Sequence, residues 1–181
     1  LLKLIQQRQR MTKDAWLTDV GHQRPGMNKG LPLAEATTKA AAIEKEIRQL
    51  AAPFPGTQSQ WEGFDRYDFE FNGQPAIVVV PKQALPGKPW AWRGEFFGAF
   101  PNADTALLGK GFHLAYLGVP NLFGSPEAVA QWNGFYLELT GKFGLAKKVT
   151  LIGLSRGGLY CYNWAAANPD KVACLYADAA V

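Results

Sequence analysis

The chain has 181 residues, of which 48% are hydrophobic and 19% are charged. This composition is typical of a globular protein, and the length suffices for one domain with a hydrophobic core but not for two ordinary ones. The formal net charge of +4 arises in the first fifty residues, which hold nine Lys and Arg against five Asp and Glu, whereas the other 131 hold ten of each. A clustered basic face for nucleic acid is therefore not expected. No apolar run of about 18 residues is present, so no membrane span is expected either.

Residues 1–55 are predicted to be an N-terminal extension with one helix. A polar stretch from Gly21 to Pro32 contains the Gly and Pro residues typical of a loop. Residues 33–52 are rich in Ala, Glu and Lys, which favours a helix. The helix should end at Pro53-Phe54-Pro55-Gly56, because proline lacks a backbone donor and restricts the residue before it. Residues 56–181 then form the predicted core domain.

The core is predicted to open with an antiparallel β-hairpin. Within residues 64–71, aromatic and acidic side chains alternate from Tyr67 to Phe71, which indicates a strand. Asn72-Gly73 follows, and both positions of this dipeptide tolerate the positive φ of a tight hairpin turn. The segment 75–81 is rich in β-branched residues and returns as the second strand.

The rest of the core alternates strands and helices. Apolar strands separated by helices are typical of a parallel sheet that is covered on both faces. The fold class predicted is therefore α/β, with a mostly parallel sheet, helices on both faces and an N-terminal hairpin. Cys161 and Cys174 both fall on segments predicted to be buried, where a free cysteine behaves as a small apolar residue. The predicted strands are 89–93, 112–119, 149–154 and 172–177, and the predicted helices are 103–110, 125–143 and 158–167.

One motif in this core carries chemistry. Gly153-Leu154-Ser155-Arg156-Gly157 matches the G-x-S-x-G nucleophile elbow, and it lies between an apolar strand and a helix, as that elbow requires. Glycines on either side of Ser155 would let strand and helix cross closely, and the helix N-terminus would favour a developing oxyanion. The alternative is a Gly/Ser-rich turn without chemistry.

On these residues and this order of elements, the chain from about Trp61 to Val181 resembles the α/β-hydrolase superfamily. The stretch from Gly153 to Pro169 is similar to the esterase and prolyl-oligopeptidase-like branch. The resemblance implies that Ser155 is the nucleophile. It also implies that two backbone N–H groups hold the oxyanion, one on Arg156 and one in the loop around Arg93-Gly94-Glu95.

The resemblance leaves several roles open at these positions. Many members carry His-Gly where this chain has Arg93-Gly94. Gly94 either allows the close backbone approach that an oxyanion site requires or is an ordinary glycine at the end of a strand. Arg93 and Arg156 either pair with a substrate carboxylate or have structural or solvated roles, which is the default expectation for arginine.

The resemblance also implies a triad in the order Ser, Asp or Glu, then His. The two histidines of the chain, His22 and His113, both precede Ser155. His113 is expected to be a buried strand residue and His22 a solvated loop residue. Asp178 is either the triad acid or a cap for the next turn. The missing histidine and a final strand that would be an unprotected edge lead us to expect an N-terminal part of a longer protein.

The function expected is hydrolysis of a carboxylic ester through an acyl-enzyme on Ser155. A serine peptidase of the prolyl-oligopeptidase type and a non-catalytic, hydrolase-like binding module are the alternatives. The expected partner is a small-molecule ester, without nucleic acid, metal or organic cofactor. Compartment and oligomeric state stay open.

Overall fold

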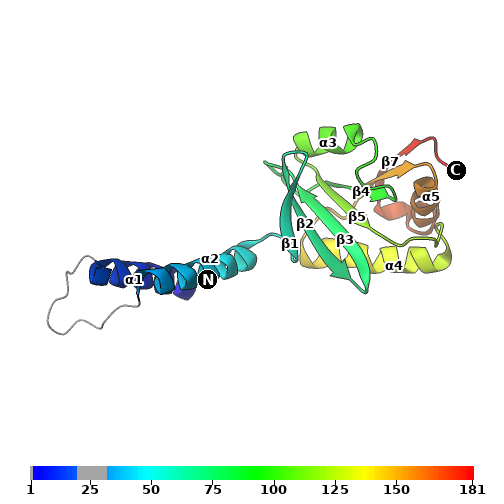
Figure 1. Cartoon of the computed structure of the whole chain (residues 1–181). Coiled ribbons are helices and arrows are strands. Elements are labelled where there is room, and N and C mark those ends of the chain that lie inside the picture. Colours follow the sequence, from blue (N-terminus) through cyan, green and yellow to red (C-terminus); the bar gives the residue numbers. More distant parts are fainter. Residues whose placement is uncertain (1, 20–31) are drawn as a thin grey trace. The chain divides into compact units, whose positions relative to one another are not determined.

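A computed structural model of the chain describes residues 2–19 and 32–181 (Figure 1). The chain divides into two compact units, Leu1–Pro53 and Phe54–Val181. Within the described residues, no helix has the length and apolar character needed to cross a membrane.

The first unit contains two helices rather than the one predicted. Helix α1 spans Leu2–Asp19 and helix α2 spans Leu33–Ala51. The α1 segment lacks Gly and Pro and is rich in Leu, Gln, Lys and Arg, which are good helix formers, so its helical propensity was the signal missed. Arg8 and Glu44 form an ion pair of 2.7 Å between the two helices. The predicted polar loop lies outside the described residues except for Pro32, which immediately precedes α2.

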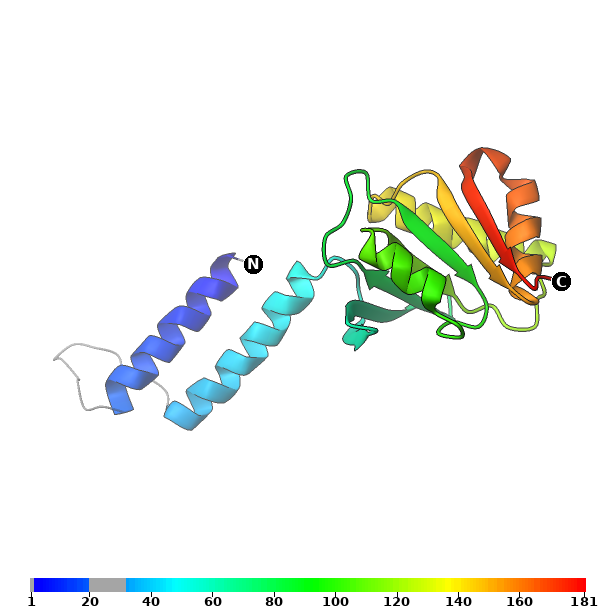
Figure 2. The same ribbon diagram turned by 90° about the horizontal axis from the view of Figure 1, so that it is seen from above.

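The second unit is built on a seven-stranded sheet with the order β1-β2-β3-β5-β4-β6-β7 (Figures 1 and 2). Strands β1, β2, β3 and β5 pair antiparallel in that order, whereas β5, β4, β6 and β7 run parallel to one another. The predicted α/β class and the N-terminal hairpin are thereby confirmed. The strands are β1 (Thr57–Trp61), β2 (Phe64–Phe71), β3 (Gln74–Val80), β4 (Trp90–Gly94), β5 (His113–Leu117), β6 (Val149–Leu154) and β7 (Val172–Asp178).

Two tight turns connect β1 to β2 and β2 to β3. Asn72 and Gly73, between β2 and β3, have φ of 50° and 77°, the positive values predicted for this hairpin. Glu62 and Gly63 make an equivalent turn, with φ of 51° and 77°, between β2 and the additional strand β1. The sequence of β1, TQSQW, is polar and largely exposed, so it lacks the apolar alternation by which strands are recognised.

Helices cover both faces of the sheet. In Figure 1, α3 (Asn102–Gly109) lies above the sheet and α4 (Pro126–Leu137) lies below it. A π-helical turn, Glu138–Lys142, continues α4, and α5 (Gly157–Ala167) packs beside α4. A short 3₁₀-helix, Pro169–Lys171, precedes β7.

The two faces have different cores because side chains alternate along each strand. Under α3, aliphatic side chains of four strands pack around Leu108. On the other face, Trp92 of β4 stacks on Trp132 of α4 with ring centroids 4.1 Å apart and meets Trp164 of α5 edge-on at 5.4 Å. These tryptophans are fully buried, so they belong to the core.

Strand β7 differs from its prediction as a buried strand. It lies at the edge of the sheet, and its side chains are exposed or half-buried. Cys174 is therefore exposed, contrary to the prediction, whereas Cys161 on α5 is buried as predicted. Burial raises the pKa of the Cys161 thiol to about 12. An apolar sequence indicates that a strand can be buried. It does not indicate whether another element packs against that strand.

Candidate active site

Ser155 lies in the turn that joins β6 to α5, at the carboxyl edge of the parallel strands. Its φ is +49°, a left-handed value that non-glycine residues adopt uncommonly. Its backbone N–H donates to the carbonyl oxygen of Asp178 (3.0 Å), and its own carbonyl oxygen accepts from the N–H groups of Gly158 (2.9 Å) and Val181 (3.2 Å). These three hydrogen bonds hold the turn in its strained conformation.

Four glycines bring the strand ends into direct contact with the start of α5. A Cβ atom added to Gly153 would lie 2.9 Å from the Cα of Gly158, closer than real Cβ contacts. A Cβ atom on Gly157 would lie 1.9 Å from the carbonyl oxygen of Gly94, and one on Gly94 would lie 2.6 Å from that of Gly157. Only glycine fits at these positions. At Gly94 the close approach is between backbones, at the junction of β4 and α5.

The loops around this turn contain further residues with left-handed backbone. They follow β4 and β5 at the same edge of the sheet as Ser155. Such conformations are costly for side chains with a Cβ and cluster at functional sites. The residues are Glu95 (φ 54°), Phe96 (φ 46°), Phe100 (φ 48°), Asn121 (φ 63°) and Phe123 (φ 46°).

The side chain of Arg156 connects these loops. Its Nε–H donates to the carboxylate of Glu95. Its guanidinium lies over the rings of Phe96, at 5.1 Å, and Phe123, at 5.7 Å, both favourable cation–π distances. Arg156 is 43% exposed, whereas Glu95 is a buried carboxylate with 8% exposure. Arg156 is therefore bonded within the site and is not a freely solvated side chain.

Tyr160 attaches the loop after β5 to α5. Its hydroxyl donates to the carbonyl oxygen of Val119 at 2.8 Å and accepts from the N–H of Phe123 at 2.9 Å. Burial raises the pKa of Tyr160, which keeps the hydroxyl protonated as a donor. Phe123, one of the two rings against Arg156, is thereby fixed to the helix that begins beside Ser155.

Arg93 lies beneath the site and is 2% exposed. Its guanidinium pairs with the fully buried carboxylate of Asp104 on α3 and donates to the carbonyl oxygen of Ala99. Burial raises the pKa of Asp104 against the opposing effect of the Arg93 charge. The Arg93 side chain thus binds the loop between β4 and α3 to the first turn of α3.

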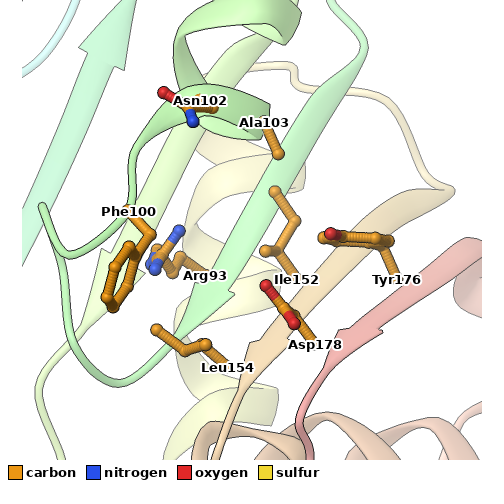
Figure 3. A pocket seen from close by; sticks show the side chains of 8 residues that line it. All are labelled: Arg93, Phe100, Asn102, Ala103, Ile152, Leu154, Tyr176 and Asp178. Atoms are coloured by element: carbon orange, nitrogen blue, oxygen red, sulfur yellow. The ribbon is translucent and has the colours of Figure 1, made fainter.

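A cavity of about 230 Å³ opens on the α3 side of β6 and β7. Figure 3 shows the Asp178 carboxylate and the Tyr176 ring on one side of it, with Arg93 and Phe100 on the other. Ile152 contributes an apolar side chain between them. Asp178 thus contributes its backbone carbonyl to the Ser155 turn and its side chain to this cavity.

His113 lies far from Ser155. It is the first residue of β5, level with Trp90 at the start of β4, whereas Ser155 follows the last residue of the parallel strand β6. Because a strand rises about 3.3 Å per residue, the length of the sheet separates them. His113 is buried, as predicted, and burial lowers its pKa to about 4. His22 lies outside the described residues. In the part of the chain that the structure covers, no three His, Cys, Asp or Glu side chains gather to hold a metal ion.

Comparison with known proteins supports the architecture. No protein-family model and no curated protein matches the sequence. Among solved structures, the chain is similar to a cold-adapted esterase from an Arctic intertidal metagenomic library in its PEG-bound form, with a TM-score of 0.55 and 12% identity over 68% of this chain and 64% of that chain. The zinc-bound form gives a TM-score of 0.51 and 12% identity over 67% of this chain and 63% of that one.

An acetyl xylan esterase from Aspergillus awamori has a TM-score of 0.50 and 17% identity over 61% of this chain and 50% of its own. Identities this low show fold and not activity. The chain has part of the α/β-hydrolase fold, as the sequence resemblance implied, and spans between half and two thirds of the length of these esterases.

The sequence predicted Gly153 and Gly157 at the crossing of strand and helix but not the side chains around it. The sequence analysis did not place Phe96, Phe123 or Tyr160 at the site. The available signal for such a role was the position of an aromatic residue close to the end of a strand. The contacts between them depend on how three separate loops meet.

Proposed function

We propose that the chain carries the nucleophile and the oxyanion site of a serine hydrolase that acts on carboxylic esters. The observation that carries this proposal is the left-handed backbone of Ser155 in a glycine-packed strand–turn–helix junction. Such a turn presents a serine hydroxyl at the edge of a sheet, and a structural turn has no need of a non-glycine residue there. The esterase names of similar folds are consistent with this chemistry.

In the proposed reaction, the Ser155 Oγ attacks the ester carbonyl carbon while a base takes its proton. The carbonyl π-electron pair moves to oxygen, and the resulting oxyanion accepts hydrogen bonds from backbone N–H groups. One donor is the N–H of Arg156, which precedes α5 and therefore has no acceptor within that helix. The other belongs to the loop that follows Gly94.

Collapse of the tetrahedral intermediate breaks the bond to the leaving alcohol, which receives the proton from the base. Water then attacks the acyl-enzyme by the same route, which releases the carboxylic acid product and restores the Ser155 hydroxyl. We assign the base to a histidine outside the described residues. His113 is too far away, because it lies at the amino end of the parallel strands and Ser155 lies at their carboxyl end. Asp178, at the end of the neighbouring strand β7, is proposed as the acid that orients this base.

A fluorophosphonate probe tests this function in the complete natural polypeptide. We expect covalent labelling of the wild-type protein that is lost in Ser155→Ala. Ser59→Ala is the matched control, since Ser59 is exposed in strand β1, and it should label at the wild-type rate. Absence of labelling in the folded wild-type protein, or equal labelling of Ser155→Ala, would contradict the proposal and favour a binding role for the fold.

A further inference from the structure

Glu95 has an uncommon combination of properties beside the proposed oxyanion site. Its backbone is left-handed, with φ of 54°, and its carboxylate is buried with 8% exposure. A buried carboxylate requires a partner to offset its desolvation. The Nε–H of Arg156 donates to this one, and the hydroxyl of Tyr160 also interacts with it. Glu95 and Arg156 are 61 positions apart in sequence, so the pair connects two loops and is not a local surface contact.

The pair extends a contact that the backbones already make. Gly94 touches Gly157 through backbone atoms, and their chain neighbours Glu95 and Arg156 pair through their side chains. The last residue of β4 and the first residue of the loop after it are therefore matched to two successive residues of the elbow. One contact sets the separation of the two backbones, and the second resists their rotation about it.

The side chain of Arg156 makes three contacts in the site. Glu95 holds Nε, while Phe96 and Phe123 lie against the guanidinium at 5.1 and 5.7 Å. Phe123 is itself bonded to Tyr160 of α5. Both aromatic residues are at least one-third exposed and have left-handed backbone, so hydrophobic burial alone does not account for their positions.

We propose that Glu95 is a positioning residue for the oxyanion site, acting through Arg156. This inference rests on the proposed hydrolase function. The carboxylate fixes the side chain of the residue whose own backbone N–H is one oxyanion donor, and it belongs to the loop that supplies the other donor. Loss of the pair removes this resistance to rotation, so the two donors shift relative to each other. Donors act on the oxyanion only within a narrow distance range of about 2.7–3.1 Å, so this movement lowers kcat and has little effect on ground-state binding.

Steady-state hydrolysis of p-nitrophenyl acetate by the complete natural polypeptide tests the inference. For Glu95→Ala we expect kcat to fall about 10- to 100-fold, as for a misplacement on the order of 1 Å, with KM changed less than about twofold. Glu95→Gln keeps the size of the side chain and an oxygen that accepts from Nε–H, so it should recover most of kcat. Glu138→Ala is the control, because it breaks the exposed Lys142–Glu138 pair of 2.7 Å and should leave kcat unchanged.

A double substitution separates positioning from a general structural role. If Glu95 acts through Arg156, adding Glu95→Ala to Arg156→Ala lowers kcat by less than about twofold more, because the partner is already absent. If the effects of the two substitutions multiply, the inference is wrong. Circular dichroism confirms folding of each variant. If Glu95→Ala fails to fold, the Arg156→Lys variant is measured in its place, because lysine lacks the Nε–H donor and the planar group. An unchanged kcat in Arg156→Lys overturns the inference.

The outcomes for the inference and for the proposed function are distinct. A wild-type protein that hydrolyses the ester while Glu95→Ala retains its kcat overturns the inference and leaves the hydrolase intact. A folded wild-type protein that neither hydrolyses the ester nor reacts with a fluorophosphonate overturns both.

Discussion

The contact between Gly157 and Gly94 offers the sharpest test of the elbow geometry. In Gly157→Ala, the new Cβ would lie 1.9 Å from the carbonyl oxygen of Gly94 and 2.8 Å from its carbonyl carbon. Both atoms are backbone, so no flexible side chain can move aside. The end of β4 and the start of α5 must separate by about 1 Å to reach the 3.0 Å limit of real Cβ contacts.

Two effects of this separation are expected. Overpacking of a tight site lowers the free energy of unfolding by about 1–3 kcal/mol, which exceeds the gain of up to about 1 kcal/mol from replacing glycine by alanine in a helix. A displacement of about 1 Å at the proposed oxyanion site lowers the rate of reaction with a fluorophosphonate by about 100-fold.

Urea denaturation followed by tryptophan fluorescence measures the first effect, and the time course of phosphonate labelling measures the second. Gly141→Ala is the matched control, since a Cβ at Gly141, in the π-helical turn, meets no atom within 4 Å. It should keep or raise the free energy of unfolding and leave labelling unchanged. If Gly157→Ala matches Gly141→Ala in both measurements, the strand and helix are not in the contact described.

Three further predictions concern the interior of the core. Asp104→Ala leaves the buried charge of Arg93 without its partner and should lower the free energy of unfolding in urea by about 3–5 kcal/mol; an unchanged midpoint would contradict the ion pair. Because the pKa of His113 is lowered to about 4 in the fold and is 6.5 in its absence, the unfolded state binds more protons between these values. The free energy of unfolding should then fall by up to about 3 kcal/mol as the pH drops through this window, and a steep fall that persists in His113→Gln would refute this cause. Iodoacetamide should alkylate Cys174 of the folded chain but not Cys161, whose burial raises its pKa to about 12, and mass spectrometry showing equal modification would contradict the burial.

Elements with a strong local signal could be predicted from the sequence. The largely apolar run Val149–Leu154 forms β6, and Asn72-Gly73 forms the hairpin turn with both φ values positive. The helix predicted from residue 125 begins as α4 after Ser125, whose hydroxyl oxygen accepts from the N–H of Ala128 at 3.3 Å. In each case the physical cause lies within a few residues of the element.

Features that depend on distant parts of the chain were not predictable. Phe96 and Phe123 adopt left-handed backbone against their intrinsic preference, because Arg156 and Tyr160 hold them from other elements. The pairing of Glu95 with Arg156 likewise requires the positions of two loops. The exposure of β7 depends on which elements cover it.

The central claim is that Ser155 forms an acyl-enzyme. The most direct measurement is to mix the complete natural polypeptide with p-nitrophenyl acetate, quench with acid within the first turnovers and map the acetyl group by peptide mass spectrometry. The account predicts a burst of p-nitrophenol and an acetyl group on the peptide that contains Ser155, both absent from Ser155→Ala. Turnover without a burst and without acetylation of that peptide, or acetylation that persists in Ser155→Ala, would contradict it.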